Sequence, residues 1–280
     1  ISGYGWSFGY VGGLIALAAC FMAFVQPENP INPFTGVLLD KGTGEHIRII
    51  NIFVAIWFAI FSLPTFLFVN DNKKAEKIKI SIFKESFSSL SRTFHEIKKY
   101  KEVLKFLFAR LVYNDALITI FAFGGIYAKQ VFKFTFNEIF LFGIILNITA
   151  GLGAFLLGFL DDILGGKKTI QISNFGLILA CLLAVGAPSI NNFLIDSKTI
   201  FWIAGTLIGI FSGPNQAASR SLMGRMTPKD KVNEFYGFFA FSGKATAFIG
   251  PLLFSTMVGL TGDLRYALAV IASLFLIGFI

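Results

Sequence analysis

Eight apolar stretches, most of them long enough to cross a lipid bilayer, constrain this chain more than any other feature of its sequence. A helix of about 20 mainly apolar residues crosses the hydrocarbon core of a membrane. Such stretches lie at residues 3–25, 47–69, 103–128, 136–160, 169–189, 200–223, 235–259 and 264–280, of which the last is the shortest. The sequence therefore predicts an all-α fold, a polytopic transmembrane helix bundle.

The amount and distribution of charge support this prediction. Charged residues make up 14% of the chain, whereas soluble domains carry about 25%. The segments 70–102, 161–168 and 224–234 together hold fourteen Lys and Arg residues, and the alternate connecting segments hold six. Basic connecting segments of membrane proteins stay on the cytoplasmic side, so these three are predicted to be cytoplasmic. Because this asymmetry accounts for most of the net charge of +8, we expect no nucleic-acid partner.

The longest polar segment, 70–102, contains apolar residues at helical spacing. They recur every three or four positions, at Phe83, Phe87, Leu90, Phe94 and Ile97. This pattern predicts an amphipathic helix. Such a helix either lies on an anionic membrane surface or packs on the bundle as a linker, and the sequence leaves both alternatives open.

The same segment divides the predicted helices into two before it and six after it. Six helices beyond a basic central loop are typical of one half of a twelve-helix transporter built from two halves. We therefore expect residues 1–69 to be the last two helices of an N-terminal half, 70–102 a cytoplasmic central loop, and 103–280 the six-helix C-terminal half. The chain begins at Ile1 without an initiator Met, so we expect it to be the C-terminal part of a longer protein.

Ionisable residues inside predicted membrane helices are costly and are therefore candidates for function. The stretch 103–128 contains Arg110, Asn114 and Asp115, and Asp115 lies about 18 Å from its start at a rise of 1.5 Å per residue. The stretch 235–259 places Lys244 at a similar depth. The sequence predicts that Asp115 and Lys244 pair across helices, as part of a substrate site or as a structural tie.

Uncharged polar residues mark two further predicted helices. Ser212, Asn215, Gln216 and Ser219 share one face of the helix at 200–223, and Asn147 lies near the middle of 136–160. Lipid cannot satisfy their hydrogen bonds, so they must face other helices or a wet cavity. We expect a shared substrate cavity lined by Asn114, Asp115, Asn147, Asn215, Gln216 and Lys244, with contacts that only join helices as the alternative.

Catalytic and metal-binding patterns are poorly represented. The histidines His46 and His95 both lie in polar segments, without a His-Glu-x-x-His motif or a Cys/His cluster that would hold a metal. There is also no Gly-rich phosphate-binding loop. We therefore expect no enzyme, no catalytic residues, no metal and no cofactor.

The segment between the stretches at 136–160 and 169–189 resembles the signature of the major facilitator superfamily. Gly158, Leu160, Asp162 and Gly165 occupy its fixed positions, and Lys167 and Lys168 provide its basic pair. Ile163 stands where the signature usually has Arg, which weakens the resemblance of this part of the gate.

Longer stretches resemble the vacuole effluxer family of autophagy-related permeases and its bacterial relatives, which belong to the same superfamily. They keep the order of the family over nearly the whole chain. The stretches are Gly5 to Gly13, Ala109 to Asp115, Gly158 to Asp162, Gly213 to Ser221, Glu234 to Gly237 and Ser242 to Pro251.

The resemblance implies a major facilitator fold with about eight of its twelve helices present. It also implies a monomeric secondary active transporter (a permease or effluxer) that works by alternating access. The cavity-lining helices of the superfamily correspond here to 103–128, 136–160, 200–223 and 235–259. Small polar solutes, amino acids above all, are the expected substrates, with protons as a further partner. The expected location is the bacterial inner membrane, or the vacuole or another endomembrane in a fungus.

The resemblance also implies gating residues, namely Gly158, Asp162, Gly165, Lys167, Lys168 and Arg220. Arg220 lies about 6 Å from the cytoplasmic end of its predicted helix. We expect Asp162 to pair with Arg220 or to cap a neighbouring helix. A membrane sensor or scaffold that keeps the fold without transporting is the alternative function, and a membrane-embedded enzyme is a more remote one.

Overall fold

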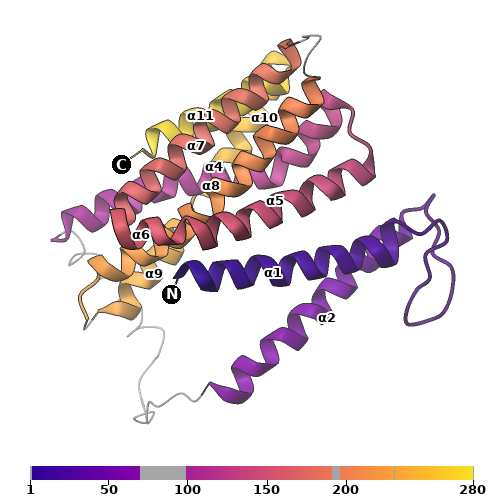
Figure 1. Ribbon diagram of the computed structural model, residues 1–280, viewed down its shortest axis with the longest axis horizontal. Coiled ribbons are helices and arrows are strands. Elements are labelled where there is room, and N and C mark those ends of the chain that lie inside the picture. The colour runs from indigo at the N-terminus through magenta and orange to yellow at the C-terminus, as the bar shows by residue number, and fades with distance from the viewer. Residues whose placement is uncertain (1, 70–98, 191–195, 230, 280) are drawn as a thin grey trace. The chain divides into compact units, whose positions relative to one another are not determined.

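The computed structural model of this protein describes residues 2–69, 99–190, 196–229 and 231–279, which are mainly helical (Figure 1). They form two compact units, residues 12–89 and residues 1–11 with 90–280. The amphipathic helix predicted from Phe83 to Ile97 lies outside the described residues.

The unit of residues 12–89 contains the second part of the helix predicted at 3–25 and the whole of the helix predicted at 47–69. It holds the second half of α1 (Ser2–Cys20), a π-helical turn (Phe21–Val25) and α2 (Glu45–Phe68). Aromatic rings connect the turn to α2, with ring centroids 6.3 Å apart for Phe24 and Phe53. Both predicted helices are confirmed.

The other unit is a bundle built around α8 (Ser197–Met226). Its described residues also form α4 (Lys101–Phe132), α5 (Phe136–Leu156), α6 (Gly158–Leu164), α7 (Gly166–Gly186), α9 (Val232–Ser242), α10 (Ile249–Thr261) and α11 (Leu264–Ile277), together with the first half of α1. α8 packs against both α5 and α7, and α11 packs against α4, α7 and α10 (Figure 1).

Local capping explains where two of these helices begin. Thr135 and Glu138 form a capping box at the start of α5, in which each side chain accepts a hydrogen bond from the other residue's backbone N–H. At the start of α11, Asp263 Oδ1 accepts a hydrogen bond of 2.9 Å from the backbone N–H of Arg265. Hydrogen bonds from Arg265 hold the pKa of the Asp263 carboxyl below its usual range.

Glycine allows α5 and α8 to approach until their backbones touch. A Cβ atom added at Gly213 of α8 would overlap the carbonyl oxygen of Ala150, and one added at Gly153 of α5 would overlap the carbonyl oxygen of Ile210. Small residues allow such close packing between membrane helices, where burial of apolar surface from water contributes little. The α5–α8 contact therefore depends on the absence of side chains at these positions.

Five helical spans within the described residues are long and apolar enough to cross a membrane. They are Gly3–Val25, Glu45–Phe68, Lys101–Phe132, Phe136–Leu164 and Gly166–Ser189. α8 is 30 residues long but carries the predicted polar face, and α10 and α11 are shorter apolar helices. The predicted all-α bundle is confirmed, with one exception.

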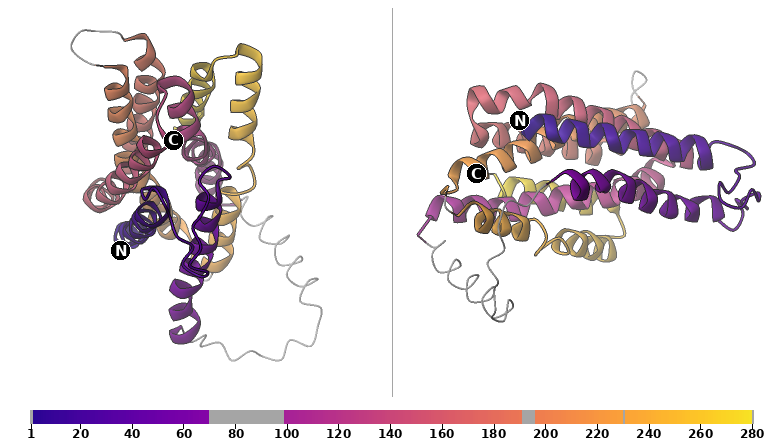
Figure 2. Two further views of the ribbon diagram at one scale, coloured as in Figure 1. Left: turned by 90° about the vertical axis from the view of Figure 1, so that its right-hand side faces the viewer. Right: turned by 90° about the horizontal axis from the view of Figure 1, so that it is seen from below.

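That exception is the stretch 235–259, which was expected to be one helix. The structure divides it into α9 and α10, separated by a turn at residues 243–248 (Figure 2, right). Pro251 provides the physical reason. In a continuous helix its nitrogen would have to donate to the carbonyl of Ala247, but proline has no N–H and its ring collides with that carbonyl. Pro251 is tolerated where it lies, in the first turn of α10.

Candidate functional site

The turn between α9 and α10 interrupts the helical hydrogen bonds, so some backbone N–H and C=O groups there have no partner within either helix. Within the turn, the N–H groups of Lys244 and Ala245 both donate to the carbonyl of Phe241, and that of Ile249 donates to the carbonyl of Thr246. Hydrocarbon cannot satisfy the groups that remain, so other residues must bind them. Side chains of α4 do so.

Arg110 of α4 binds the C-terminal end of α9. Its Nη1 donates to the carbonyl oxygen of Phe239 at 2.8 Å and to Ser242 Oγ at 2.9 Å. The guanidinium carbon also lies 3.6 Å from the centroid of the Phe239 ring. The C-terminus of a helix carries a partial negative charge, so a cation is favourable at this position.

The next turn of α4 binds the rest of the interruption. Asn114 Nδ2 donates to the carbonyl of Gly243 at 3.1 Å, and Asp115 Oδ2 accepts from the backbone N–H of Gly250 at 2.6 Å. Gly250 is the second residue of α10, so the carboxylate caps a helix N-terminus, where negative charge is favourable. α4 thus places a cation at the end of α9 and an anion at the start of α10. We call Arg110, Asn114 and Asp115 the α4 clamp.

The predicted pairing of Asp115 with Lys244 is wrong in this structure. Asp115 is buried, with 4% of the residue exposed, and the described residues contain no ion pair that includes it. Lys244 is exposed in the turn. The prediction treated 235–259 as one helix and considered only side-chain partners, whereas the carboxylate binds a backbone N–H that the interruption leaves free.

Asn215 of α8 is also not in an open cavity, where the sequence predicts it. It is fully buried, and its Nδ2 donates to Asn174 Oδ1 of α7 at 2.8 Å. One turn further along α8, Ser219 shares a hydrogen bond of 2.8 Å with Tyr113 of α4. These contacts connect α4, α7 and α8, so Asn215 matches the alternative of a contact that joins helices. The sequence prediction missed Asn174, although a polar residue within an apolar stretch signals such a contact.

Gln216 faces a different neighbour from the adjacent Asn215, because successive helical residues point about 100° apart. Its Nε2 donates to the hydroxyl of Tyr10 in the first half of α1, at 3.1 Å. Asn147 of α5 is half-buried, and its side chain donates within its own helix, to the carbonyl of Gly143. The six predicted cavity residues therefore do not share one set of hydrogen bonds. A role for Gln216 or Asn147 in binding solute stays a prediction.

At the far end of α8, the predicted gate takes a different form. Asp161 of α6 is buried and forms an ion pair with Arg225 of α8. Asp162 and Arg220 are both exposed, and neither forms an ion pair within the described residues, so this structure does not contain their predicted pairing. The alternative, in which Asp162 caps a neighbouring helix, stays a prediction. The segment is helical, so its two adjacent aspartates point in different directions and only Asp161 reaches α8.

The other predicted gating residues lie at the ends of α6 and at the start of α7. Gly158 begins α6, and Gly165 ends it with a positive φ of 82°, a conformation that glycine adopts without strain. Lys167 and Lys168 are exposed in the first turn of α7. A gating role for these residues stays a prediction.

The Asp161–Arg225 ion pair leads to a stability prediction. We expect Asp161→Asn and Arg225→Gln each to destabilise the full-length protein, with a coupling energy of about 1 kcal/mol in a double-mutant cycle, because Asp161 is buried while Arg225 is partly exposed. Detergent-induced unfolding measures the coupling. The matched pair Asp162→Asn and Arg220→Gln is expected to show none. Equal coupling energies for the two pairs would contradict the assignment.

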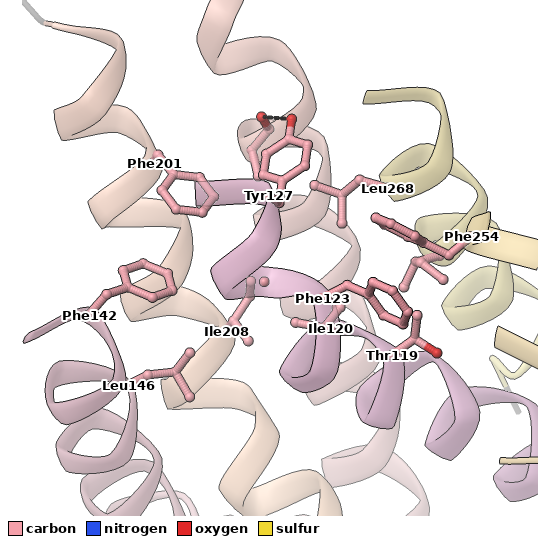
Figure 3. A pocket seen from close by; sticks show the side chains of 13 residues that line it. Thr119, Ile120, Phe123, Tyr127, Phe142, Leu146, Phe201, Ile208, Phe254 and Leu268 are labelled. Carbon is pink, nitrogen blue, oxygen red and sulfur yellow. Dashed lines mark hydrogen bonds between the residues drawn. The ribbon is translucent and has the colours of Figure 1, made fainter. Parts of the chain in front are cut away.

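The bundle also contains a small apolar cavity of about 30 Å³ between α4, α5, α7, α8, α10 and α11 (Figure 3). Apolar side chains such as Phe123, Phe142, Phe201 and Phe254 line most of it. Tyr127 directs its hydroxyl away, to the carbonyl of Ala184 at 2.9 Å. A cavity of this size holds about one water molecule, and a water needs at least two polar partners. This cavity therefore does not suit a polar solute.

One sequence pattern points towards catalysis, but its structural context does not. Gly5 to Gly9 reads Gly-Trp-Ser-Phe-Gly, the spacing of a hydrolase nucleophile elbow. That elbow requires a sharp strand-to-helix turn, whereas Ser7 lies within α1 and its hydroxyl donates to the carbonyls of Gly3 and Gly151. The described residues also contain no group of three or more His, Cys, Asp or Glu that could hold a metal ion.

Comparison with known protein families identifies the family of this chain. A family model described as vacuole effluxer Atg22 like matches residues 1–280. The chain belongs to this family. The resemblance seen in its sequence is therefore confirmed.

Individual members of the family show the same relationship. The chain is 25% identical over 284 residues to the uncharacterized MFS-type transporter YxiO of Bacillus subtilis, covering 100% of the chain and 61% of that protein. It is 24% identical over 282 residues to autophagy-related protein 22 of Kluyveromyces lactis (95% of the chain, 54% of the relative). It is 23% identical over 297 residues to autophagy-related protein 22-1 of Aspergillus fumigatus (98% and 46%). The chain thus spans about half the length of these relatives, and the likeness to an MFS-type transporter supports the major facilitator fold.

Proposed function

We propose that the protein containing this chain is a secondary active transporter of small polar solutes that works by alternating access. The observation that carries the proposal is the interrupted helix α9–α10, whose two ends are bound by buried and half-buried polar residues of α4. Interrupted helices whose ends offer charge to a ligand are a recurrent feature of transporter sites, and ionisable residues at membrane depth mark solute or ion pathways. Membership of an effluxer family supports the same function.

Residues 103–280 act in this proposal as the C-terminal half of the transporter, residues 1–69 as the last two helices of the N-terminal half, and residues 70–102 as a cytoplasmic connection. The transporter works as a monomer in the membrane of a bacterial cell or of a fungal vacuole. Amino acids are the proposed substrates, because the polar groups of α4, α8 and the turn at 243–248 include both signs of charge. A zwitterion needs both.

Gln216 is the residue we assign to solute contact. Its amide lies on α8 beside Tyr10 and is half-buried, whereas Asn215 is fully buried and its Nδ2 donates to Asn174 of α7. One lost hydrogen bond to a solute corresponds to about a tenfold change in affinity. Gln216→Ala is therefore expected to raise the apparent KM about tenfold in a protein that remains folded.

Counterflow tests the proposal. The full-length protein, reconstituted into vesicles preloaded with a mixture of unlabelled amino acids, is expected to take up labelled amino acids faster than protein-free vesicles. Gln130→Ala provides a matched control, because Gln130 is exposed at the end of α4 and is expected to leave the KM unchanged. Uptake equal to that of protein-free vesicles for every amino acid would contradict this substrate class and favour a sensor or scaffold.

A further inference from the structure

The carboxylate of Asp115 is buried with its two oxygens in unequal environments. Oδ2 accepts the hydrogen bond from Gly250, whereas Oδ1 has no hydrogen-bond partner within the described residues. The residue as a whole is 4% exposed. A polar atom buried without a partner is costly and calls for a ligand or a function.

The absence of a side chain at Gly250 permits this arrangement. A Cβ there would overlap Thr119 Oγ1 and lie 3.3 Å from Asp115 Oδ2. Thr119 does not compensate the free oxygen, because its hydroxyl donates to the backbone carbonyl of Asp115 at 2.7 Å. The site is thus closely packed around one carboxylate.

No counter-charge accompanies this carboxylate. On α4 itself, Arg110 binds Phe239 and Ser242, and Tyr113 bonds to Ser219. α10 carries no ionisable residue. The other helices that pack against α4 carry their ionisable residues within about two helical turns of a helix end, and the connecting segment 243–248 carries one more. These residues are Glu138 on α5, Lys198, Arg220 and Arg225 on α8, Glu234 and Tyr236 on α9, Lys244 in the connecting segment, and Arg265 and Tyr266 on α11. The described residues include no ion pair with Asp115.

Two effects therefore oppose each other at Asp115. Burial without a counter-charge favours the neutral, protonated carboxyl. The N–H of Gly250 and the N-terminus of α10 favour the ionised carboxylate. If α10 moved away, only the first effect would remain. Proton binding and release of α10 are consequently coupled, and each promotes the other by thermodynamic linkage.

We infer that Asp115 is a proton-binding site that controls the interruption between α9 and α10. The ionised carboxylate caps α10 and holds the two half-helices in the conformation described above. When it takes a proton from water, the cap weakens and the segment from Gly243 to Leu252 is released. The biological role of this site rests on the proposed transport function, because a proton bound at a movable element can couple a proton gradient to solute movement. Its test needs no solute.

Infrared difference spectroscopy of the full-length protein in lipid nanodiscs detects the site directly. Lowering the pH is expected to produce the carbonyl band of a buried protonated carboxylic acid, and Asp115→Asn is expected to abolish it. Asp115→Glu is expected to retain the band with a shifted midpoint, which keeps the test informative if the Asn variant folds poorly. Asp263→Asn is the matched control, because Asp263 also caps a helix but lies in a connecting segment, and it should leave the band unchanged.

Hydrogen exchange of the segment 243–252 reports the release of this segment. The exchange rate is measured by mass spectrometry at each pH and divided by the rate of the Asp115→Asn variant at the same pH. We expect the wild-type ratio to increase about tenfold as the pH falls through the midpoint of the band. A band that persists in Asp115→Asn, a midpoint that depends on sodium concentration, or a constant exchange ratio would each overturn the inference. A normal band and exchange response without any solute counterflow would count against the proposed transport function alone.

Discussion

Replacing Gly213 by alanine is expected to lower the free energy of unfolding of the full-length protein by about 2 kcal/mol. The new methyl group would overlap the carbonyl oxygen of Ala150 and also lie 3.0 Å from the Cβ of Ala154, so α5 and α8 would have to separate. A backbone oxygen within a helix cannot turn aside as the end of a flexible side chain can. The loss is measured by detergent-induced unfolding of the purified protein.

Gly259→Ala is the matched control for this prediction. Gly259 lies within α10, and a Cβ atom there would meet nothing within 4 Å. Alanine has a higher helix propensity than glycine, so this change is expected to leave stability unchanged or to raise it by less than about 1 kcal/mol. Equal losses from the two substitutions would mean that the close α5–α8 contact is absent in the protein.

The second large effect is expected at Arg110. Arg110→Leu removes the donor that serves both the Phe239 carbonyl and the Ser242 hydroxyl, and it removes the cation at the end of α9. Loss of a half-buried charge that makes two hydrogen bonds costs about 3 kcal/mol. Arg110→Lys is expected to lie between the wild type and Arg110→Leu, because lysine keeps the charge but loses the planar set of donors.

Arg220→Leu controls for the loss of an arginine as such. Arg220 is exposed and forms no ion pair within the described residues, so its replacement is expected to change the free energy of unfolding by less than about 0.5 kcal/mol. The same unfolding measurement compares both variants. Similar losses of unfolding free energy at the two positions would show that Arg110 does not stabilise the end of α9 in the purified protein.

The apolar stretches predicted the helices because a span of given length must satisfy its own backbone in lipid. Hydropathy does not report where the backbone is interrupted, since residues 243–248 are too few and too mixed to lower the average of 235–259. Pro251 is the available signal, because a proline eight residues before the end of a predicted helix removes one hydrogen bond inside it. Reading that residue would have placed the start of α10 correctly.

The sequence indicates the three residues of the α4 clamp, because charged and amide side chains at membrane depth are rare. Their partners were not found, since the sequence cannot show that a backbone N–H or carbonyl is free to bind them. The sequence predicts that Asp115 pairs with Lys244, and that Asp162 pairs with Arg220 or caps a helix, whereas the structure has Asp115 on Gly250 and the neighbouring Asp161 on Arg225. In both cases the expected partner had the right charge, and local helix geometry decided against it.

The clamp gives a physical reason for the order of charges along α4. Arg110 and Asp115 lie five residues apart, and they bind the end of one half-helix and the start of the next. Exchanging their charges would place a carboxylate at the negative end of α9 and a cation at the positive end of α10. The polarity of the clamp thus fits the direction of the interrupted helix.

Electron cryo-microscopy of the full-length protein in a lipid nanodisc tests the central claim most directly. The expected map shows two half-helices separated near residues 243–248, with the Arg110 guanidinium on the Phe239 carbonyl and the Asp115 carboxylate on the Gly250 amide. An uninterrupted helix from Val232 to Thr261, with Arg110 and Asp115 bound elsewhere, would contradict the account.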